Sequence, residues 1–234
     1  MVDFDEDIML DVNLENVGSQ MAQGIEAKLT SSDQYVDVND STEVWGNISA
    51  SSTSLKNSAF EFMTSDEIPD QHIISFALEI EDNSGGNWNS AFNITVNAPE
   101  LSIGDIQMTD VNGGNGDGII DPGETIEISI ECLNNGHSDA PSTAAVLNSS
   151  SMYLNILNPS IALGSLAKGS AINSVFTVDV DAATPVGTPL EFDFSLASGK
   201  FNVQSDFILK VGMVAEDFET GNFLKFPWTT SGNK

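Results

Sequence analysis

A glycine-rich stretch in the middle of the chain carries most of the side chains that could bind a metal ion. Calcium takes six to eight oxygen ligands, and short Asp and Asn side chains on a glycine-rich backbone can wrap around it. On the twelve-residue pattern of calcium loops, residues 115, 117, 121 and 124 take ligand positions and Gly118 takes the glycine position, whereas Gly113 stands where an acidic ligand belongs. An inserted turn would let residue 110 or 112 supply that ligand. The candidate ligands are Asp110, Asn112, Asn115, Asp117, Asp121 and Glu124.

The same stretch has a second interpretation that needs no ion. Asp and Asn side chains accept hydrogen bonds from backbone amides two residues on, and these bonds stabilise turns. Asp121, Pro122, Gly123 and Glu124 would then form an ordinary turn before a strand. Both interpretations stay open. A bound calcium ion would have a structural role and would stiffen the joint between two domains.

The other reactive side chains do not combine into a catalytic site, and we expect no enzyme activity. His72 and His137 are distant in the sequence. The run of His137, Ser138 and Asp139 cannot form a triad, because a triad is assembled in space from separate segments. Cys132 occupies an apolar strand position, which favours a small core residue over a nucleophile.

Trp88 is the candidate for binding an organic ligand. It follows Gly86 and Asn87 at an expected hairpin tip, where an indole ring can stack on a sugar or anchor a partner. Packing of the ring over its own loop is the alternative. A glycan-binding surface should expose two or more aromatic rings in one plane, whereas a spacer should expose none.

The charge balance excludes two classes of partner. The chain has 35 acidic residues against 7 basic ones, a formal net charge of -28, and every basic residue is a lysine. Nucleic acids and anionic membrane surfaces are both bound through clusters of Lys and Arg. No stretch reaches the ~18 apolar residues of a membrane-spanning helix. We therefore expect no nucleic-acid partner and no membrane insertion.

The chain contains an internal duplication. Ile8 corresponds to Ile126 and Gly18 to Gly136, both at an offset of 118 residues. The correspondence continues downstream with slips of one or two residues, which loops tolerate between fixed strands. Offsets of 116 and 115 relate the later pairs Phe76/Phe192 and Phe92/Phe207.

Each repeat has the pattern of short β-strands. Apolar residues alternate with Glu and Ser between residues 126 and 132, the period of two that half-buries a strand. The same alternation recurs in residues 76–80, 190–194 and 207–211, with Asn- and Gly-rich turns between them. About seven short strands per repeat is typical of an immunoglobulin-like sandwich. The predicted fold class is all-β, with two tandem immunoglobulin-like β-sandwiches.

The repeats suggest three parts. Residues 1–98 form sandwich 1, residues 99–213 form sandwich 2, and residues 214–234 are the truncated start of a third domain. Pro99 precedes the expected opening strand of the second repeat, and Asp3 corresponds to Asp121. The opening strand of the first repeat is therefore expected to be missing, which leaves a sheet edge that a neighbour could cover.

Two segments carry a resemblance to known families. Residues 115–125 (NGDGIIDPGET), followed by an apolar strand and by Asn135 and Gly136, resemble the opening of bacterial CARDB-like adhesion repeats. Residues 216–223 (EDFETGNF) and the Phe226, Pro227 and Trp228 that follow resemble the start of jelly-roll cleaved-adhesin modules. Together they resemble the region downstream of the catalytic domain in gingipain-like C25 cysteine peptidases, whose catalytic Cys and His do not map onto this chain.

The resemblance implies a secreted or cell-surface bacterial parent protein with several domains. The expected function is a non-catalytic spacer or adhesion module accessory to a gingipain-like peptidase. Its partners would be other domains of the same polypeptide and host surface proteins. The alternative is a glycan-binding module that uses loop aromatics such as Trp88.

Overall fold

The computed structural model describes residues 1–110 and 112–212, and throughout these residues the regular structure is β-strand. The strands up to the joint are β1 (Val2–Asp3), β2 (Asp7–Asn16), β3 (Ala22–Thr30), β4 (Val36–Asp40), β5 (Thr42–Ile48), β6 (Ser52–Thr64), β7 (His72–Glu81) and β8 (Asn87–Asn97). After it come β9 (Leu101–Thr109), β10 (Thr125–Asn134), β11 (Ala140–Asn148), β12 (Leu154–Ile156), β13 (Ser160–Leu166), β14 (Ser170–Val180), β15 (Pro189–Ser198) and β16 (Phe201–Lys210).

The strands up to β8 form one sandwich. One sheet has the order β1-β8-β7-β3-β5 and the other the order β2-β6-β4. Alternate residues point inward, because successive side chains of a strand face opposite sides of its sheet. The inward residues include Phe60, Phe62 and Phe76, which are at most 1% exposed. Burying each such ring stabilises the fold by roughly 1.5–3 kcal/mol.

The strands from β9 onward form a second sandwich with its own core. Its sheets have the orders β12-β14-β10-β9 and β13-β11-β15-β16. The predicted alternation in β10 is confirmed, since Ile126, Ile128, Ile130 and Cys132 are all 0% exposed. Together with the antiparallel pairing of the sheets, these two packed cores confirm the predicted all-β class and its immunoglobulin-like sandwiches.

Equivalent residues of the two repeats pack in the same way. The rings of Phe76 and Phe92 stack with centroids 5.3 Å apart, and those of Phe192 and Phe207 stack at 5.1 Å. Gly46 and its counterpart Gly164 also share a left-handed backbone, with φ of 74° and 76°, a conformation that glycine adopts without steric cost. The duplication seen in the sequence therefore extends to side-chain packing and to local backbone geometry.

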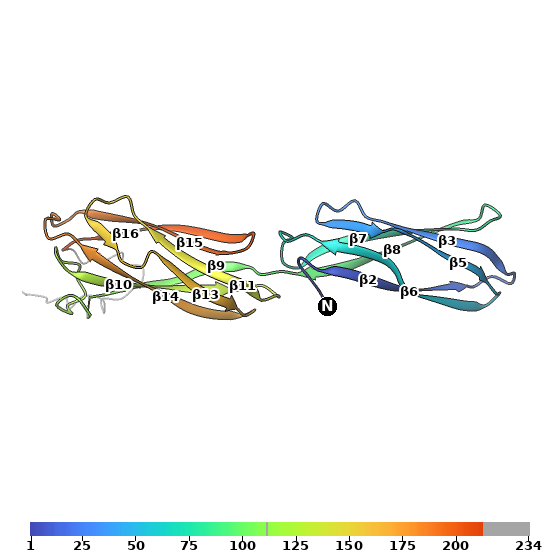
Figure 1. Ribbon diagram of the computed structural model, residues 1–234, viewed down its shortest axis with the longest axis horizontal. Helices are drawn as coiled ribbons and strands as arrows, with labels where there is room; N and C mark the ends of the chain where they lie inside the picture. The colour runs from blue at the N-terminus through green and yellow to red at the C-terminus, as the bar shows by residue number, and fades with distance from the viewer. Residues whose placement is uncertain (111, 213–234) are drawn as a thin grey trace, which may run out of the picture.

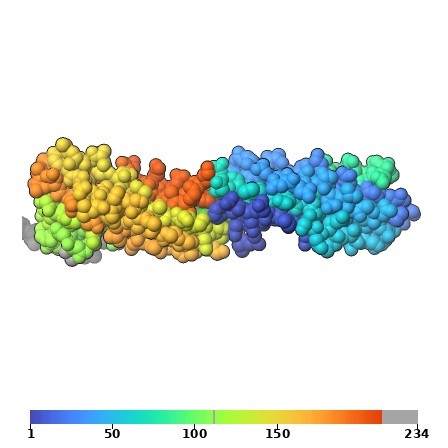
Figure 2. Space-filling view, in the orientation of Figure 1, coloured from blue at the N-terminus to red at the C-terminus, as the bar shows by residue number. Residues whose placement is uncertain are grey.

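The two sandwiches lie end to end in one elongated particle (Figure 1). The chain crosses from β8 to β9 through Ala98, Pro99 and Glu100. Figure 2 shows the two lobes in contact, with the orange-red end of the second against the blue and cyan of the first. None of the described residues belongs to a helix that could span a membrane.

The two sandwiches differ at one edge. In the second, β10 pairs with β14 on one side and with β9 on the other. In the first, its counterpart β2 pairs with β6 and is the last strand of its sheet. The described residues thus contain no counterpart of β9 in the first sandwich. The predicted third domain, residues 214–234, lies outside the described residues.

Candidate functional site

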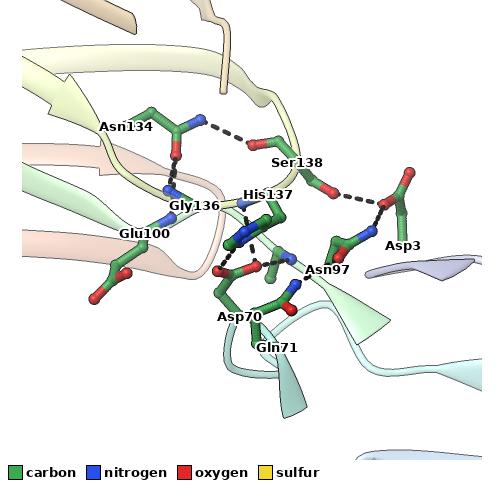
Figure 3. Close-up of polar contacts among 10 residues, drawn as sticks. Asp3, Asp70, Gln71, Asn97, Glu100, Asn134, Gly136, His137 and Ser138 are labelled. Atoms are coloured by element: carbon green, nitrogen blue, oxygen red, sulfur yellow. Dashed lines mark hydrogen bonds and ion pairs between the residues drawn. The ribbon is translucent and has the colours of Figure 1, made fainter. Parts of the chain in front are cut away.

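A cluster of polar contacts lies at the joint between the sandwiches (Figure 3). The loop after β10 closes over the connecting segment through backbone hydrogen bonds. The amides of His137 and Ser138 both donate to the carbonyl of Ala98, at 3.1 and 3.3 Å, and the amide of Asn135 donates to the carbonyl of Glu100 at 2.8 Å. The second sandwich therefore binds the last residues of the first as an extended segment.

Asn134, at the end of β10, organises this loop and is 0% exposed. Its side-chain oxygen accepts hydrogen bonds from the amides of Glu100 and Gly136, at 3.1 and 3.0 Å. Its side-chain nitrogen donates to the carbonyls of Ser138 and Leu166, at 2.9 and 3.0 Å. A side-chain amide offers two donors and two acceptor positions, and all four are used here.

Asp70 and His137 form the ion-pair-like contact across the joint. The Oδ2 of Asp70 lies 2.7 Å from the Nδ1 of His137, and its Oδ1 accepts from the amides of Ala98 and His137 at 2.9 and 3.2 Å. Burial, with the Asp70 side chain 9% exposed, acts to raise the pKa of this carboxyl. The hydrogen bonds from Ala98 and His137 outweigh burial, so the pKa of Asp70 is lowered.

A second polar chain joins the sandwiches beside it. The hydroxyl of Ser138 donates to the Oδ1 of Asp3 at 2.6 Å, and the side-chain amide of Asn97 donates to the same oxygen at 3.2 Å. Gln71 donates to Asn97 at 2.6 Å. Asn97 and Ser138 are both 6% exposed, so these bonds are partly shielded from water.

Close packing completes the joint. A Cβ at Gly136 would lie 2.3 Å from the carbonyl oxygen of Ala98 and 2.4 Å from the amide nitrogen of Glu100. Both are backbone atoms, so glycine is required for the loop to lie this close to the connecting segment. An aromatic contact also joins the two sandwiches. The ring of Phe4, after β1, and the ring of Phe201, at the start of β16, meet edge to face with centroids 5.0 Å apart, a favoured aromatic geometry.

The sequence analysis does not predict the joint as a site. It considers His137 but not Asp70, because 67 residues lie between them and polar loop contacts have no periodicity. One signal was present. At the positions that correspond to His137 and Ser138, the first repeat has Ser19 and Gln20. A departure from the duplicated pattern therefore marks the residues that act only at the joint.

In the glycine-rich stretch, the structure brings the predicted metal ligands into one loop. Asp110 is 2% exposed. Its Oδ2 accepts from the amides of Gly116 and Asp117, both at 3.1 Å, and its Oδ1 accepts from the amide of Gly118 at 3.3 Å. The Asp110 carboxylate is thus surrounded by N–H donors, as in a turn that binds its own side chain.

The other candidate ligands make similar bonds. The carboxylate of Glu124 accepts from the amides of Asn115 and Asp121, both at 2.9 Å. The Asn115 side chain donates to Asp121 at 3.2 Å, the Asp117 side chain accepts from the amide of Ile119, and Asn112 is exposed. These oxygens have the chemistry that calcium prefers. In residues 1–110 and 112–212, however, no group of three or more His, Cys, Asp or Glu side chains is arranged to hold a metal ion. Calcium binding by this loop stays a prediction.

Trp88 lies on β8 and is 49% exposed. A Cβ at Gly86 would lie 2.7 Å from its ring, so the indole packs against its own hairpin. Trp88 is the one aromatic residue among the exposed large hydrophobic side chains of the described chain. Trp88 borders an apolar groove that Phe92 also lines, and glycan binding there stays a prediction.

The residues considered for catalysis are held in structural roles. Cys132 is 0% exposed, and burial raises the pKa of its thiol, which makes it a poor nucleophile. The Nε2 of His72 lies 2.7 Å from the Oδ2 of Asp33 and its ring packs edge-on against Tyr35. Ser138 donates to Asp3, as described above.

Comparisons with known proteins identify no family. No family model matches the chain, and no curated protein matches it. Solved structures similar to it include BspA_C_mut (9% identity, TM-score 0.41, covering 86% of this chain and 90% of that one) and BspA_C_WT (9%, 0.37, 86% and 91%). A protein of unknown function from Porphyromonas gingivalis W83 is also similar (10%, 0.28, 88% and 93%). At these values the comparisons assign no function to the chain.

Proposed function

We propose that this chain is a non-catalytic, rigid spacer that holds neighbouring domains of a secreted or surface-attached bacterial protein apart. The observation that carries the proposal is the joint. Its connecting segment is bound by the loop after β10, with Ala98 0% exposed, and is locked by the buried Asn134 and by the pair of Asp70 and His137. A flexible linker would lie in solvent and would make few such bonds.

The acidic composition supports a role at an exposed surface. A formal net charge of -28 keeps an extended chain soluble and suppresses non-specific association. The resemblance of residues 115–125 to CARDB-like repeats, and of residues 216–223 to cleaved-adhesin modules, supports a place in a gingipain-like peptidase or a related adhesin. In that setting the spacer would separate a catalytic domain from the cell surface, and contact with host proteins would extend its role to adhesion.

The distance between spin labels on the two sandwiches tests rigidity. Ile73 on β7 and Ile172 on β14 are 55% and 42% exposed, and each lies near the joint end of its strand. They can be labelled as cysteines because Cys132 is buried. A rigid spacer predicts one narrow distance distribution from double electron–electron resonance. A broad distribution would contradict the proposal, and a double label within the second sandwich, at Ile172 and Ile208, calibrates the width expected of a rigid body.

A further inference from the structure

The loop that docks at the joint contains an Asn-Gly pair, Asn135 and Gly136. In such a pair the backbone nitrogen of the glycine can attack the side-chain carbonyl carbon of the asparagine, because glycine has no Cβ to hinder the approach. The equivalent loop of the first repeat has Val17 in place of Asn135. Asparagine at this position is therefore a feature of the docked loop alone, as His137 and Ser138 are.

The reaction of such a pair consumes water and needs no other reagent. The Gly136 nitrogen forms a bond to Cγ of Asn135, the bond from Cγ to Nδ2 breaks, and ammonia leaves with the proton of the Gly136 amide. The succinimide that results takes up one water molecule. Addition of water at the side-chain carbonyl gives aspartate. Addition at the main-chain carbonyl gives isoaspartate, in which the main chain runs through the side chain and is one methylene longer.

The closed joint restrains the backbone of this pair. For the reaction to occur, the peptide group between Asn135 and Gly136 must move so that the Gly136 nitrogen reaches Cγ. The amide of Asn135 donates to the carbonyl of Glu100 at 2.8 Å, and the amide of His137 donates to the carbonyl of Ala98 at 3.1 Å. Gly136 between them is buried. The residues on both sides of the reacting peptide group are thus bonded to the connecting segment, which restrains its movement.

The side chain of Asn135, in contrast, is accessible to water. It is exposed, and its Nδ2 donates to the hydroxyl of Ser102 at 2.8 Å. The water needed for hydrolysis therefore reaches the site. Protection against the reaction comes from the docked backbone and not from burial of the side chain.

We propose that Asn135 is a site of spontaneous deamidation that makes opening of the joint irreversible. The reaction is slow while the joint is closed, and it proceeds in molecules whose joint has opened. The isoaspartate product then prevents the joint from closing again. This inference rests on the proposed rigid joint, because a joint that is always open would give the pair no protection.

The packing around Gly136 explains why the product cannot close. A Cβ at Gly136 would lie 2.3 Å from the carbonyl oxygen of Ala98 and 2.4 Å from the amide nitrogen of Glu100. There is no space here for an added carbon. The extra methylene of isoaspartate would displace Gly136 from this contact, and the amides on its two sides could not both reach the carbonyls that they bind now.

The rate of deamidation depends on the population of open joints. The reaction is slow compared with the opening and closing of a loop contact, so its rate follows the fraction of molecules that are open. Opening does not free the pair completely. In the undocked loop of the first repeat, the side chain of Asn16 still accepts from the amide of Gly18, as Asn134 does from Gly136. We therefore expect the slowest reaction in the closed joint, a faster one in an opened joint and the fastest in a free peptide.

Incubation of the whole chain at mildly alkaline pH, followed by peptide mapping and an isoaspartate assay, measures the rate at Asn135. The references are a free peptide of residues 133–139 (LNNGHSD) and the variant Asp70→Ala, which removes the acceptor of the Ala98 and His137 amides. The wild type should react about tenfold or more slowly than the peptide, and Asp70→Ala about threefold or more faster than the wild type. If Asp70→Ala does not fold, Ser138→Ala replaces it, because it removes only the bond to Asp3.

A second Asn-Gly pair, Asn115 and Gly116, provides an internal reference. It lies in the segment between β9 and β10, and the Gly116 amide donates to Asp110 at 3.1 Å. Its rate should be the same in the wild type and in Asp70→Ala, because it makes no contact that the variant removes.

The control variant for the second half of the proposal is Asn135→Gln. Its side chain would have to close a larger ring, so it reacts more slowly, and it loses only the exposed bond to Ser102. After long incubation the wild type, spin-labelled at positions 73 and 172, should show a broadened distance distribution. Asn135→Gln, labelled and incubated in the same way, should keep a narrow one.

Two results would overturn the inference. In the first, Asn135 reacts as fast in the wild type as in Asp70→Ala while the rates at Asn115 agree. In the second, chains that contain isoaspartate keep the narrow distribution. Freshly prepared wild type tests the spacer separately. A narrow distribution before incubation leaves the spacer function standing when the inference fails, whereas a broad one overturns the spacer and with it the closed state that the inference requires.

Discussion

Replacing Gly136 by alanine should release the joint while leaving both sandwiches folded. The new Cβ would lie 2.3 Å from the carbonyl oxygen of Ala98 and 2.7 Å from the carbonyl carbon of Pro99. These are backbone atoms, so the clash is relieved only if the loop and the connecting segment move apart. Each sandwich has its own core cluster, which this movement does not disturb.

The size of the effect follows from the bonds that span the contact. Three backbone hydrogen bonds join residues 135–138 to Ala98 and Glu100. At a net value of about 1 kcal/mol each, their loss weakens the closed joint by about 3 kcal/mol. That corresponds to a decrease of roughly two orders of magnitude in the equilibrium constant between closed and open joints. The pair of Asp70 and His137 depends on the same closure and would be lost with it.

The spin-label pair at Ile73 and Ile172 measures the result. Gly136→Ala should broaden the distance distribution, while circular dichroism shows unchanged strand content. The matched control is Gly18→Ala, the equivalent position in the first repeat. There a new Cβ would lie 3.1 Å from the side-chain oxygen of Asn16 and near no backbone atom. A distribution as narrow in Gly136→Ala as in Gly18→Ala would refute the view that close packing at this glycine keeps the joint closed.

Three further predictions concern single carboxylates. The lowered pKa of the Asp70 carboxyl means that the folded chain binds a proton at this group more weakly than the unfolded chain does. The stabilisation that Asp70 gives, measured by urea unfolding against Asp70→Asn, should be complete above about pH 5 and should fade as the pH drops through about 4 and below. A difference between the two proteins that stays constant down to pH 2 would contradict this. Asp110→Ala should lower the unfolding free energy of the second sandwich by about 2–3 kcal/mol, because the three hydrogen bonds from the amides of Gly116, Asp117 and Gly118 to the Asp110 carboxylate are lost at about 1 kcal/mol each, and an unchanged denaturation midpoint would refute that role. If calcium binds the loop, the thermal unfolding midpoint should be higher in millimolar calcium than in EDTA for the wild type but not for Asp117→Ala. Wild-type unfolding curves that coincide in calcium and in EDTA would contradict calcium binding and favour a turn stabilised by its own side chains.

The strands were predictable because their signal is local and periodic. In β10, alternation alone placed Cys132 inward, and the structure buries it completely. The constant offset between the repeats then related Phe76 to Phe192, and the structure shows the same ring stacking at both. Such inferences need only the period of a strand and a comparison of the chain with itself.

The contacts at the joint could not be predicted in the same way. Asp70 and His137 lie in loops of different repeats, and no period connects them. In the glycine-rich stretch, the residue types allow both calcium ligands and a turn that binds its own side chains, whereas the direction of the N–H groups is a property of the folded backbone. Gly116 and Gly118 have φ of 80° and 79°, and this left-handed geometry turns their amides toward Asp110. Composition alone could not distinguish a loop that binds a cation from one that binds its own carboxylate.

The duplication explains how an ordinary loop became a joint. Asn16 makes three of the four bonds that Asn134 makes: its side-chain oxygen accepts from the amide of Gly18 at 3.0 Å, and its side-chain nitrogen donates to the carbonyls of Gln20 and Ile48 at 2.8 and 3.0 Å. Both repeats therefore have the loop geometry, and this geometry alone does not produce docking, because the loop after β2 is exposed at the far end of the first sandwich.

Docking requires partners supplied by the neighbouring sandwich. Asp70 accepts from the backbone and the ring of His137, and Asp3 accepts from the hydroxyl of Ser138. The first repeat has Ser19 and Gln20 at the two corresponding positions, so its loop cannot make the same pair of contacts. The specificity of the joint thus resides in a few side chains added to a loop that each repeat already forms. We therefore expect substitutions at Gly136, Asp70 or His137 to loosen the proposed rigid joint without changing the fold of either sandwich.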